Sequence, residues 1–212
     1  QLTLGCQATE CVVQPAVLST ILGTGTAGFL YGKALAAQVS APQAVARASG
    51  GDLYLADTGN HRIRKLDTAG NVSTFAGTGT AGWVDGLSSQ AQFHTPVALA
   101  FDAAGNLYVS DEGTHRIRRV TPSGIVTTVA GNGSAGYVDG LVAVAAFSSP
   151  GGLAFDASGN LLVADRGNER IRKISPDGNV TTVAGSGAAG YLDGAPTSAK
   201  FSDPRDLAFD DQ

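Results

Sequence analysis

Residue types that could carry chemistry, among them glycine, histidine and aspartate, recur along this chain at a fixed interval. Glycines spaced as Gly-x-Gly-x-x-Gly match a phosphate-binding turn, and they start at Gly23, Gly77, Gly131 and Gly185. A phosphate turn must open a helix whose N-terminus meets the phosphate. No helical spacing follows here, so the glycines indicate a linker. We expect its aromatic residues to pack at the bend of the linker: Trp83, Tyr137 and Tyr191.

Histidine and aspartate are the candidates for metal binding or catalysis. His61 and His115 hold equivalent places in the repeat, so His94 is the single histidine worth testing. One histidine makes neither a metal site nor a catalytic triad. The linker aspartates are expected to cap their own turns, with a cation site as the alternative: Asp85, Asp139 and Asp193. We predict no catalytic, cofactor-binding or metal-binding residues, and no enzyme activity.

Charge argues against binding to nucleic acid. The chain has 14 Lys and Arg against 18 Asp and Glu, for a net charge of −4. Binding to a phosphate backbone depends on excess positive charge, which is absent here. No apolar run approaches the length of a membrane span. We therefore expect protein partners, copies of this chain among them, rather than nucleic acid or a membrane span.

The elements that must position these residues belong to a repeat of 54 residues. Short runs rich in Val, Ile and Leu alternate with turns rich in Asp, Asn and Gly, which is typical of β-hairpins. In the third copy this pattern predicts four strands, at 152–155, 161–165, 170–174 and 180–184. Four short antiparallel strands per repeat of this length are typical of a β-propeller blade. We predict an all-β propeller of four-stranded antiparallel blades.

An aspartate and an arginine recur at the ends of the second and third strands. We expect each pair to face across the hairpin and to fix its register by a charge-assisted hydrogen bond. These pairs are Asp57 with Arg62, Asp111 with Arg116, and Asp165 with Arg170.

The segment 56–65, Ala-Asp-Thr-Gly-Asn-His-Arg-Ile-Arg-Lys, resembles the core motif of the NHL repeat family. The resemblance recurs in three copies and implies a propeller, usually of six blades, that acts as a binding platform. The long linkers are similar to those of secreted bacterial members and of large extracellular proteins, which implies a secreted, extracellular or cell-surface protein. Related propellers also include metal-dependent lyases and hydrolases, so an enzyme or a small-ligand binder using the central channel is the alternative.

The ends of the chain carry incomplete copies of the repeat. We predict one propeller domain, 1–212, of about four blades. Three repeats fall at 42–76, 96–130 and 150–184, with linkers at 23–41, 77–95, 131–149 and 185–203. A fourth blade would be split between 1–22 and 204–212, and the residues expected in its strands are Leu18, Ile21, Arg205, Leu207 and Phe209.

Three arrangements fit this split blade. The two ends could close a ring within one molecule, or one molecule could complete the blade of the next. The chain could also be part of a larger propeller. Completion between molecules is head-to-tail and can build oligomers or filaments.

Cysteine usage gives one further expectation. The chain has two cysteines, Cys6 and Cys11, which lie before the first full repeat. Two cysteines this close together predict a small disulfide loop, with free thiols as the alternative.

Overall fold

The computed structural model describes residues 4–7, 10–13 and 18–209. The fold is all-β, with three five-stranded antiparallel sheets and one two-stranded hairpin. The hairpin joins β1 (Leu4–Gln7) to β2 (Glu10–Val13). Helix is limited to single 3-10 turns: η1 (Ala34–Ala36), η2 (Thr58–Asn60), η3 (Glu112–Thr114) and η4 (Arg166–Asn168). In the described residues no helix is long and apolar enough to cross a membrane.

Each sheet is one copy of the repeat. The first contains β3 (Gly32–Lys33), β4 (Ala44–Arg47), β5 (Leu53–Asp57), β6 (Arg62–Leu66) and β7 (Asn71–Ala76). The second contains β8 (Gly86–Leu87), β9 (Pro96–Phe101), β10 (Leu107–Asp111), β11 (Arg116–Val120) and β12 (Ile125–Ala130). The third contains β13 (Gly140–Leu141), β14 (Pro150–Phe155), β15 (Leu161–Asp165), β16 (Arg170–Ile174) and β17 (Asn179–Ala184). The four strands predicted for the third copy are confirmed to within two residues.

The predicted number of strands per blade was wrong. A fifth strand comes from the linker that precedes each blade, and it pairs with the last strand of that blade. Thus β8 pairs with β12 through Gly86 opposite Val126 and Leu87 opposite Ile125. A two-residue strand is too short to show the alternation of apolar and polar residues from which strands are recognised.

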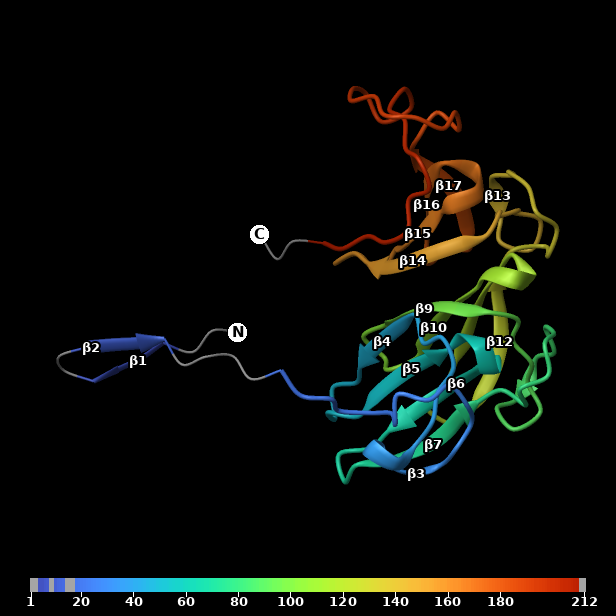
Figure 1. Ribbon diagram of the computed structural model, residues 1–212. Coiled ribbons are helices and arrows are strands. Elements are labelled where there is room, and N and C mark those ends of the chain that lie inside the picture. Colours follow the sequence, from blue (N-terminus) through green and yellow to red (C-terminus); the bar gives the residue numbers. More distant parts are fainter. Residues whose placement is uncertain (1–3, 8–9, 14–17, 210–212) are drawn as a thin grey trace.

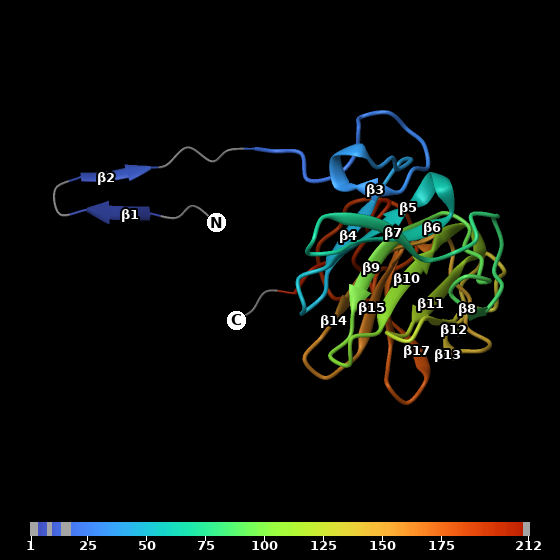
Figure 2. The same ribbon diagram turned by 90° about the horizontal axis from the view of Figure 1, so that it is seen from below.

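The three sheets lie side by side as blades (Figures 1 and 2). Their innermost strands are neighbours, because β9 contacts both β4 and β14. Two apolar clusters fill the spaces between blades, around Phe93 between the first and second blades and around Phe147 between the second and third. Both phenylalanines are fully buried. Since each comes from a linker, the linkers help to hold neighbouring blades together.

The prediction of about four blades was also wrong in its count, while the blade split between 1–22 and 204–212 stays a prediction, because it includes residues outside the described ones. The described residues form three blades. Neither 18–22 nor 205–209 is in a strand, and no strand pairing joins them. Leu18 is 99% exposed, and Ile21 and Phe209 are exposed as well. The Arg205 carbonyl accepts a hydrogen bond from the Gly152 N–H of β14, but neither segment joins a sheet of the described residues.

Cys6 and Cys11 lie outside the residues whose side chains the structure describes. Cys6 and Cys11 are directly opposite each other in the backbone register of β1 and β2. The disulfide therefore stays a prediction that the strand pairing permits.

Candidate protein-interaction site

Three arginines are buried in the blades, one in the third strand of each. Arg64, Arg118 and Arg172 each have no exposed surface. Each forms an ion pair with the aspartate that ends the preceding strand, at 3.2 Å to Asp57, 3.3 Å to Asp111 and 2.7 Å to Asp165. Buried charges are tolerated when they are paired and hydrogen-bonded, as these are.

This pairing corrects the predicted partner of the aspartate. Asp57 faces Arg62 in the backbone register, as predicted. Its carboxylate, however, bonds Arg64, and Arg62 donates instead to the backbone carbonyls of Asn60 and Thr78. A buried carboxylate needs donors inside the blade, and Arg64 is the buried arginine of the two. The same correction applies to Arg116 and Arg170, whose neighbours Arg118 and Arg172 take the ion pair.

Burial changes the pKa of the Asp111 carboxyl group. It accepts hydrogen bonds from the His94 backbone N–H at 2.7 Å and from the Thr114 hydroxyl at 2.7 Å, besides its contact with Arg118. Burial nevertheless raises the pKa of Asp111 to about 6. Burial also raises the pKa of Asp165. The arginine partner therefore keeps a carboxylate charged where burial alone favours the neutral form.

The linker aspartates bind the same buried arginines. Asp85 contacts Arg118 at 2.6 Å and accepts the backbone N–H of Thr128 at 2.9 Å. Asp139 contacts Arg172 at 2.7 Å. The expectation that these aspartates cap their own turns was wrong, because the linker folds across the blade and carries each carboxylate to the arginine. The linker is thereby fastened to the blade that follows it.

In the first three linkers an aromatic residue covers the first arginine of the third strand of the blade. The guanidinium carbon lies 3.9 Å from the Phe29 ring centre for Arg62, 4.3 Å from Trp83 for Arg116, and 3.8 Å from Tyr137 for Arg170. These are cation–π distances. Trp83 and Tyr137 therefore lie over arginines of the blade, and that they pack at the bend of the linker stays a prediction. We call this arrangement the linker clamp: an aromatic on the first arginine, an aspartate on the second, and a short strand on the blade edge.

Histidines join neighbouring blades. The His61 Nδ1 accepts the backbone N–H of Thr95 at 3.2 Å, and the His115 Nδ1 accepts that of Ser149 at 3.1 Å. The ring of His94 packs edge-on against His61, with 5.5 Å between centroids. His94, the candidate histidine of the sequence, therefore lies beside a histidine that joins two blades. In the part of the chain described, no group of three or more His, Cys, Asp or Glu is arranged to hold a metal ion.

His61 gives a prediction about pH. Burial, followed by the nearby His94 and Arg62, lowers the pKa of His61. The unfolded chain then takes up a proton at higher pH than the folded one, so stability falls as the pH drops below the ordinary histidine value of about 6.5. Glutamine at position 61 could accept the same N–H without titrating. We expect the stability of the wild type relative to His61→Gln to fall between pH 7.5 and pH 5.5 in urea unfolding. An unchanged difference would contradict this role.

The linker 185–203 is not clamped to a blade of the described residues. Tyr191 is 88% exposed, whereas Tyr137 at the same place in the repeat is 43% exposed. Asp193 accepts a hydrogen bond from the Tyr191 hydroxyl at 3.2 Å and forms no ion pair in the described residues. Figure 1 shows this linker, in red, projecting beyond the sheet that contains β17.

The segment after this linker, 204–209, also lies outside the described strands. It passes beside β14, where the Gly152 N–H donates to the Arg205 carbonyl at 2.8 Å. Leu207 is partly buried, and Phe209 is 47% exposed. We call residues 185–209 the C-terminal arm. It presents the parts of a linker clamp and a segment at the repeat position of β14, and it belongs to none of the described sheets.

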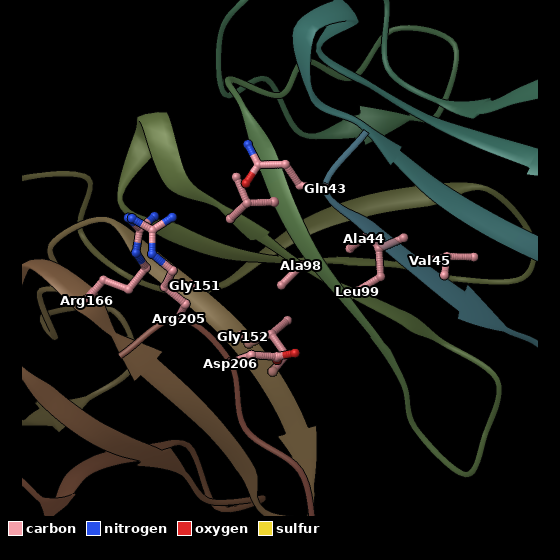
Figure 3. A pocket seen from close by; sticks show the side chains of 12 residues that line it. Gln43, Ala44, Val45, Ala98, Leu99, Gly151, Gly152, Arg166, Arg205 and Asp206 are labelled. Carbon is pink, nitrogen blue, oxygen red and sulfur yellow. The ribbon is translucent and has the colours of Figure 1, made fainter. Parts of the chain in front are cut away.

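A cavity of about 400 Å³ lies where the inner strands meet the C-terminal arm (Figure 3). It is lined chiefly by the early residues of each inner segment, among them Gln43, Val97, Gly151, Gly152, Arg205 and Asp206. Arg166 and Arg205 lie close together at one end of the cavity. Asp203 contacts both arginines, at 2.8 Å and 2.5 Å, and Glu112 contacts Arg166 at 2.7 Å. Hydrogen bonding to Asp203 raises the pKa of Arg166, and hydrogen bonding to Arg166 lowers that of Asp203.

Side-by-side antiparallel sheets of this kind, with adjacent innermost strands, define blades of a β-propeller. The family model described as the NHL repeat matches residues 40–66 and 147–174, which run from the end of a linker to the third strand of a blade. This chain contains NHL repeats, and NHL repeats are protein-interaction modules.

Two curated relatives illustrate the likeness. Human NHL repeat-containing protein 2 is 34% identical over 106 residues, covering 48% of this chain and 15% of the relative. Mouse teneurin-3 is 31% identical over 193 residues, covering 82% of this chain and 7% of the relative. This chain therefore spans less than a sixth of either protein.

A solved structure shares the fold. The auxiliary nutrient binding protein of Bacteroides thetaiotaomicron superposes with a TM-score of 0.66 at 21% identity, covering 82% of this chain and 44% of that chain. At this identity the likeness concerns the fold alone.

Proposed function

We propose that this chain is a non-enzymatic protein-interaction module that acts outside the cell and associates with copies of itself through the C-terminal arm. The observation that carries this proposal is the exposed linker clamp in that arm. Its tyrosine and aspartate occupy places that, in the two preceding linkers, lie on arginines of a blade. A surface with the shape and charge to hold a blade suits another protein chain that offers β-strands.

The location outside the cell is supported by the cysteines. Cys6 and Cys11 are opposite each other in a hairpin, which suits a disulfide. Disulfides persist in oxidising compartments. We expect no free thiol in the protein isolated without reductant, as measured by thiol labelling and mass spectrometry. Two labelled cysteines would count against this part of the proposal.

Self-association is tested by sedimentation equilibrium over a range of concentrations. We expect the average mass of the wild type to rise with concentration. A charge in the arm, Phe209→Asp, should shift the protein toward the monomer, because an apolar contact then includes a desolvated carboxylate. Leu141→Asp is the matched control, since Leu141 is also exposed but lies on β13, outside the arm. A wild type that stays monomeric at every concentration would contradict self-association.

The cavity of about 400 Å³ favours a second candidate, a small-ligand binder at the inner strands. Its volume falls in the range of ligand pockets. The amide of Gln43 would give a bound molecule a hydrogen-bonding partner. Thermal unfolding with a panel of sugars and small carboxylic acids tests this candidate. A stabilising compound whose effect disappears in Gln43→Ala would support it, and no stabilisation by any compound would count against it.

A further inference from the structure

A second cavity lies between the second and third blades and shares no lining residue with the cavity at the inner strands. Its volume is about 210 Å³. Arg119 of β11 is the one charged residue among the described residues that line it. The rest of the lining is largely apolar and comes from both blades, including Tyr108, Val129, Phe155, Leu161 and Ile174.

The guanidinium of Arg119 is unsatisfied within the part of the chain that the structure describes. Two buried side-chain nitrogen or oxygen atoms there have no hydrogen-bond partner, and they are the Arg119 Nε and the Thr127 hydroxyl oxygen. Arg119 and Thr127 are directly opposite each other on β11 and β12, so their side chains lie on the same face of the sheet. A buried donor without an acceptor is costly and calls for an explanation.

The same position of the first blade is neutralised by a carboxylate. Lys65 holds the repeat position of Arg119, and its ammonium group pairs with Asp52 at 2.6 Å. In the second blade the position of Asp52 is taken by Asn106, whose side-chain N–H donates to Asp102 at 2.7 Å. Arg119 therefore forms no ion pair among the described residues, although its counterpart does.

The space beside Arg119 also comes from a difference between the two blades. In the first blade the Phe75 ring packs edge-on against Tyr54, with 4.8 Å between the ring centroids. Tyr108 holds the position of Tyr54, but Val129 stands at the position of Phe75. The smaller valine leaves room beside the Tyr108 ring, and both residues line the cavity.

We propose that this cavity binds a small carboxylic acid that carries an aromatic ring. The carboxylate pairs with Arg119, whose planar donors match the two oxygens of a carboxylate. The ring takes the space that Phe75 fills in the first blade. An apolar cavity of about 150 Å³ can hold benzene, so a cavity of about 210 Å³ accommodates one ring with its carboxyl group.

A ligand at this place contacts two blades at once. Tyr108 and Arg119 belong to the second blade, and Phe155 and Leu161 belong to the third. The Tyr108 and Phe155 rings meet edge-on across the junction, with 5.0 Å between their centroids. Binding is thereby limited to the folded chain and should raise its unfolding temperature. This site goes beyond the protein-interaction function proposed above and uses no residue of the C-terminal arm.

Benzoate is the probe that tests the site in the full chain. At constant ionic strength, we expect benzoate to cause saturable shifts in the amide NMR signals of β10, β11 and β15. Benzamide keeps the ring but has no charge, and acetate keeps the charge but has no ring. Each should bind at least about tenfold more weakly than benzoate, because one loses the charge-assisted hydrogen bonds and the other loses the buried ring.

Two variants separate the cation from the space. Arg119→Met removes the cation, and Val129→Phe fills the cavity with the residue found in the first blade. Each should weaken benzoate binding by at least about tenfold. Lys173→Met is the matched control, because Lys173 holds the same repeat position in the third blade and is not part of the cavity lining. Its dissociation constant for benzoate should stay within about threefold of the wild type.

Thermal unfolding without ligand separates a folding defect from a binding defect. Val129→Phe should unfold at or above the wild-type temperature, because the new ring can pack on Tyr108 as Phe75 packs on Tyr54. The site is overturned if benzoate gives no saturable shifts up to its solubility limit. It is also overturned if either Arg119→Met or Val129→Phe binds benzoate as tightly as the wild type does.

Discussion

Replacing Arg118 by methionine should lower the free energy of unfolding by about 3 to 5 kcal/mol at neutral pH. The guanidinium of Arg118 is buried and contacts Asp111, Asp85 and the carbonyls of Val84 and Gln92. Methionine fills much of the same volume but leaves the Asp111 carboxylate buried without its cation. Removing one member of a buried ion pair costs far more than removing both. Urea unfolding monitored by circular dichroism measures the loss.

The dependence of this loss on pH identifies its cause. The pKa of Asp111 is raised to about 6 by burial even with the arginine present, and without Arg118 it should rise further. Its folded pKa then lies well above its unfolded value, so protonation at low pH relieves the destabilisation. The loss relative to the wild type should be smaller at pH 5 than at pH 8. A loss that is equal at both values would show that packing, not charge, accounts for it.

Arg116→Met is the matched control, two residues earlier on the same strand. Arg116 donates to the backbone carbonyls of Thr114 and Asn132 and lies over the Trp83 ring, at the protein surface. Hydrogen bonds of this kind contribute about 0.5 to 1.5 kcal/mol each. We expect a smaller loss than for Arg118→Met and little change of that loss between pH 5 and pH 8.

Replacing Gly131 by alanine should lower the free energy of unfolding by about 3 kcal/mol or more. Gly131 begins a linker with φ of +99°, a region that side-chain-bearing residues rarely adopt. A Cβ there would lie 2.5 Å from the His115 carbonyl oxygen and 3.1 Å from the Arg116 Cα. Both are backbone atoms of the adjacent turn and strand, so the linker itself would have to move. Thermal and urea unfolding measure the effect.

Gly105→Ala separates the two contributions. Gly105 has a similar positive φ of +82°, but the nearest atom to an added Cβ is the Pro122 Cγ, at an ordinary 3.8 Å. The alanine variant should lose about 1 to 2 kcal/mol, from the left-handed backbone alone. Equal losses at positions 105 and 131 would contradict the close approach of the linker to the preceding turn.

Much of the scaffold could be predicted from sequence, because strands and hairpin turns are local signals. The strand at 161–165 and the strand at 170–174 were predicted with their observed bounds. The backbone register of Asp165 opposite Arg170 was also predicted, since the turn length fixes it. The fifth strand of each blade was missed, because its two residues pair with a strand about 40 positions away.

The site depended on contacts that sequence spacing does not show. In each blade the buried aspartate pairs with the second arginine of an Arg-x-Arg sequence rather than with the first. Burial decided this choice: Arg172 has no exposed surface and bonds both Asp165 and Asp139. The available signal was the repeat itself, because Arg64, Arg118 and Arg172 recur at the same interval as the linker aspartates. The tyrosine at position 31 interrupts that pattern and marks the blade with the incomplete clamp.

Amide hydrogen exchange in the C-terminal arm tests most directly whether the arm is a protein-binding element. Outside a complex, the backbone N–H groups of Leu207, Ala208 and Phe209 have no strand partner in the described residues and should exchange rapidly. Exchange at 205–209 should slow markedly as protein concentration rises, while β10, inside the middle blade, stays protected throughout. Equally rapid exchange at 205–209 at the lowest and highest concentrations would contradict this expectation.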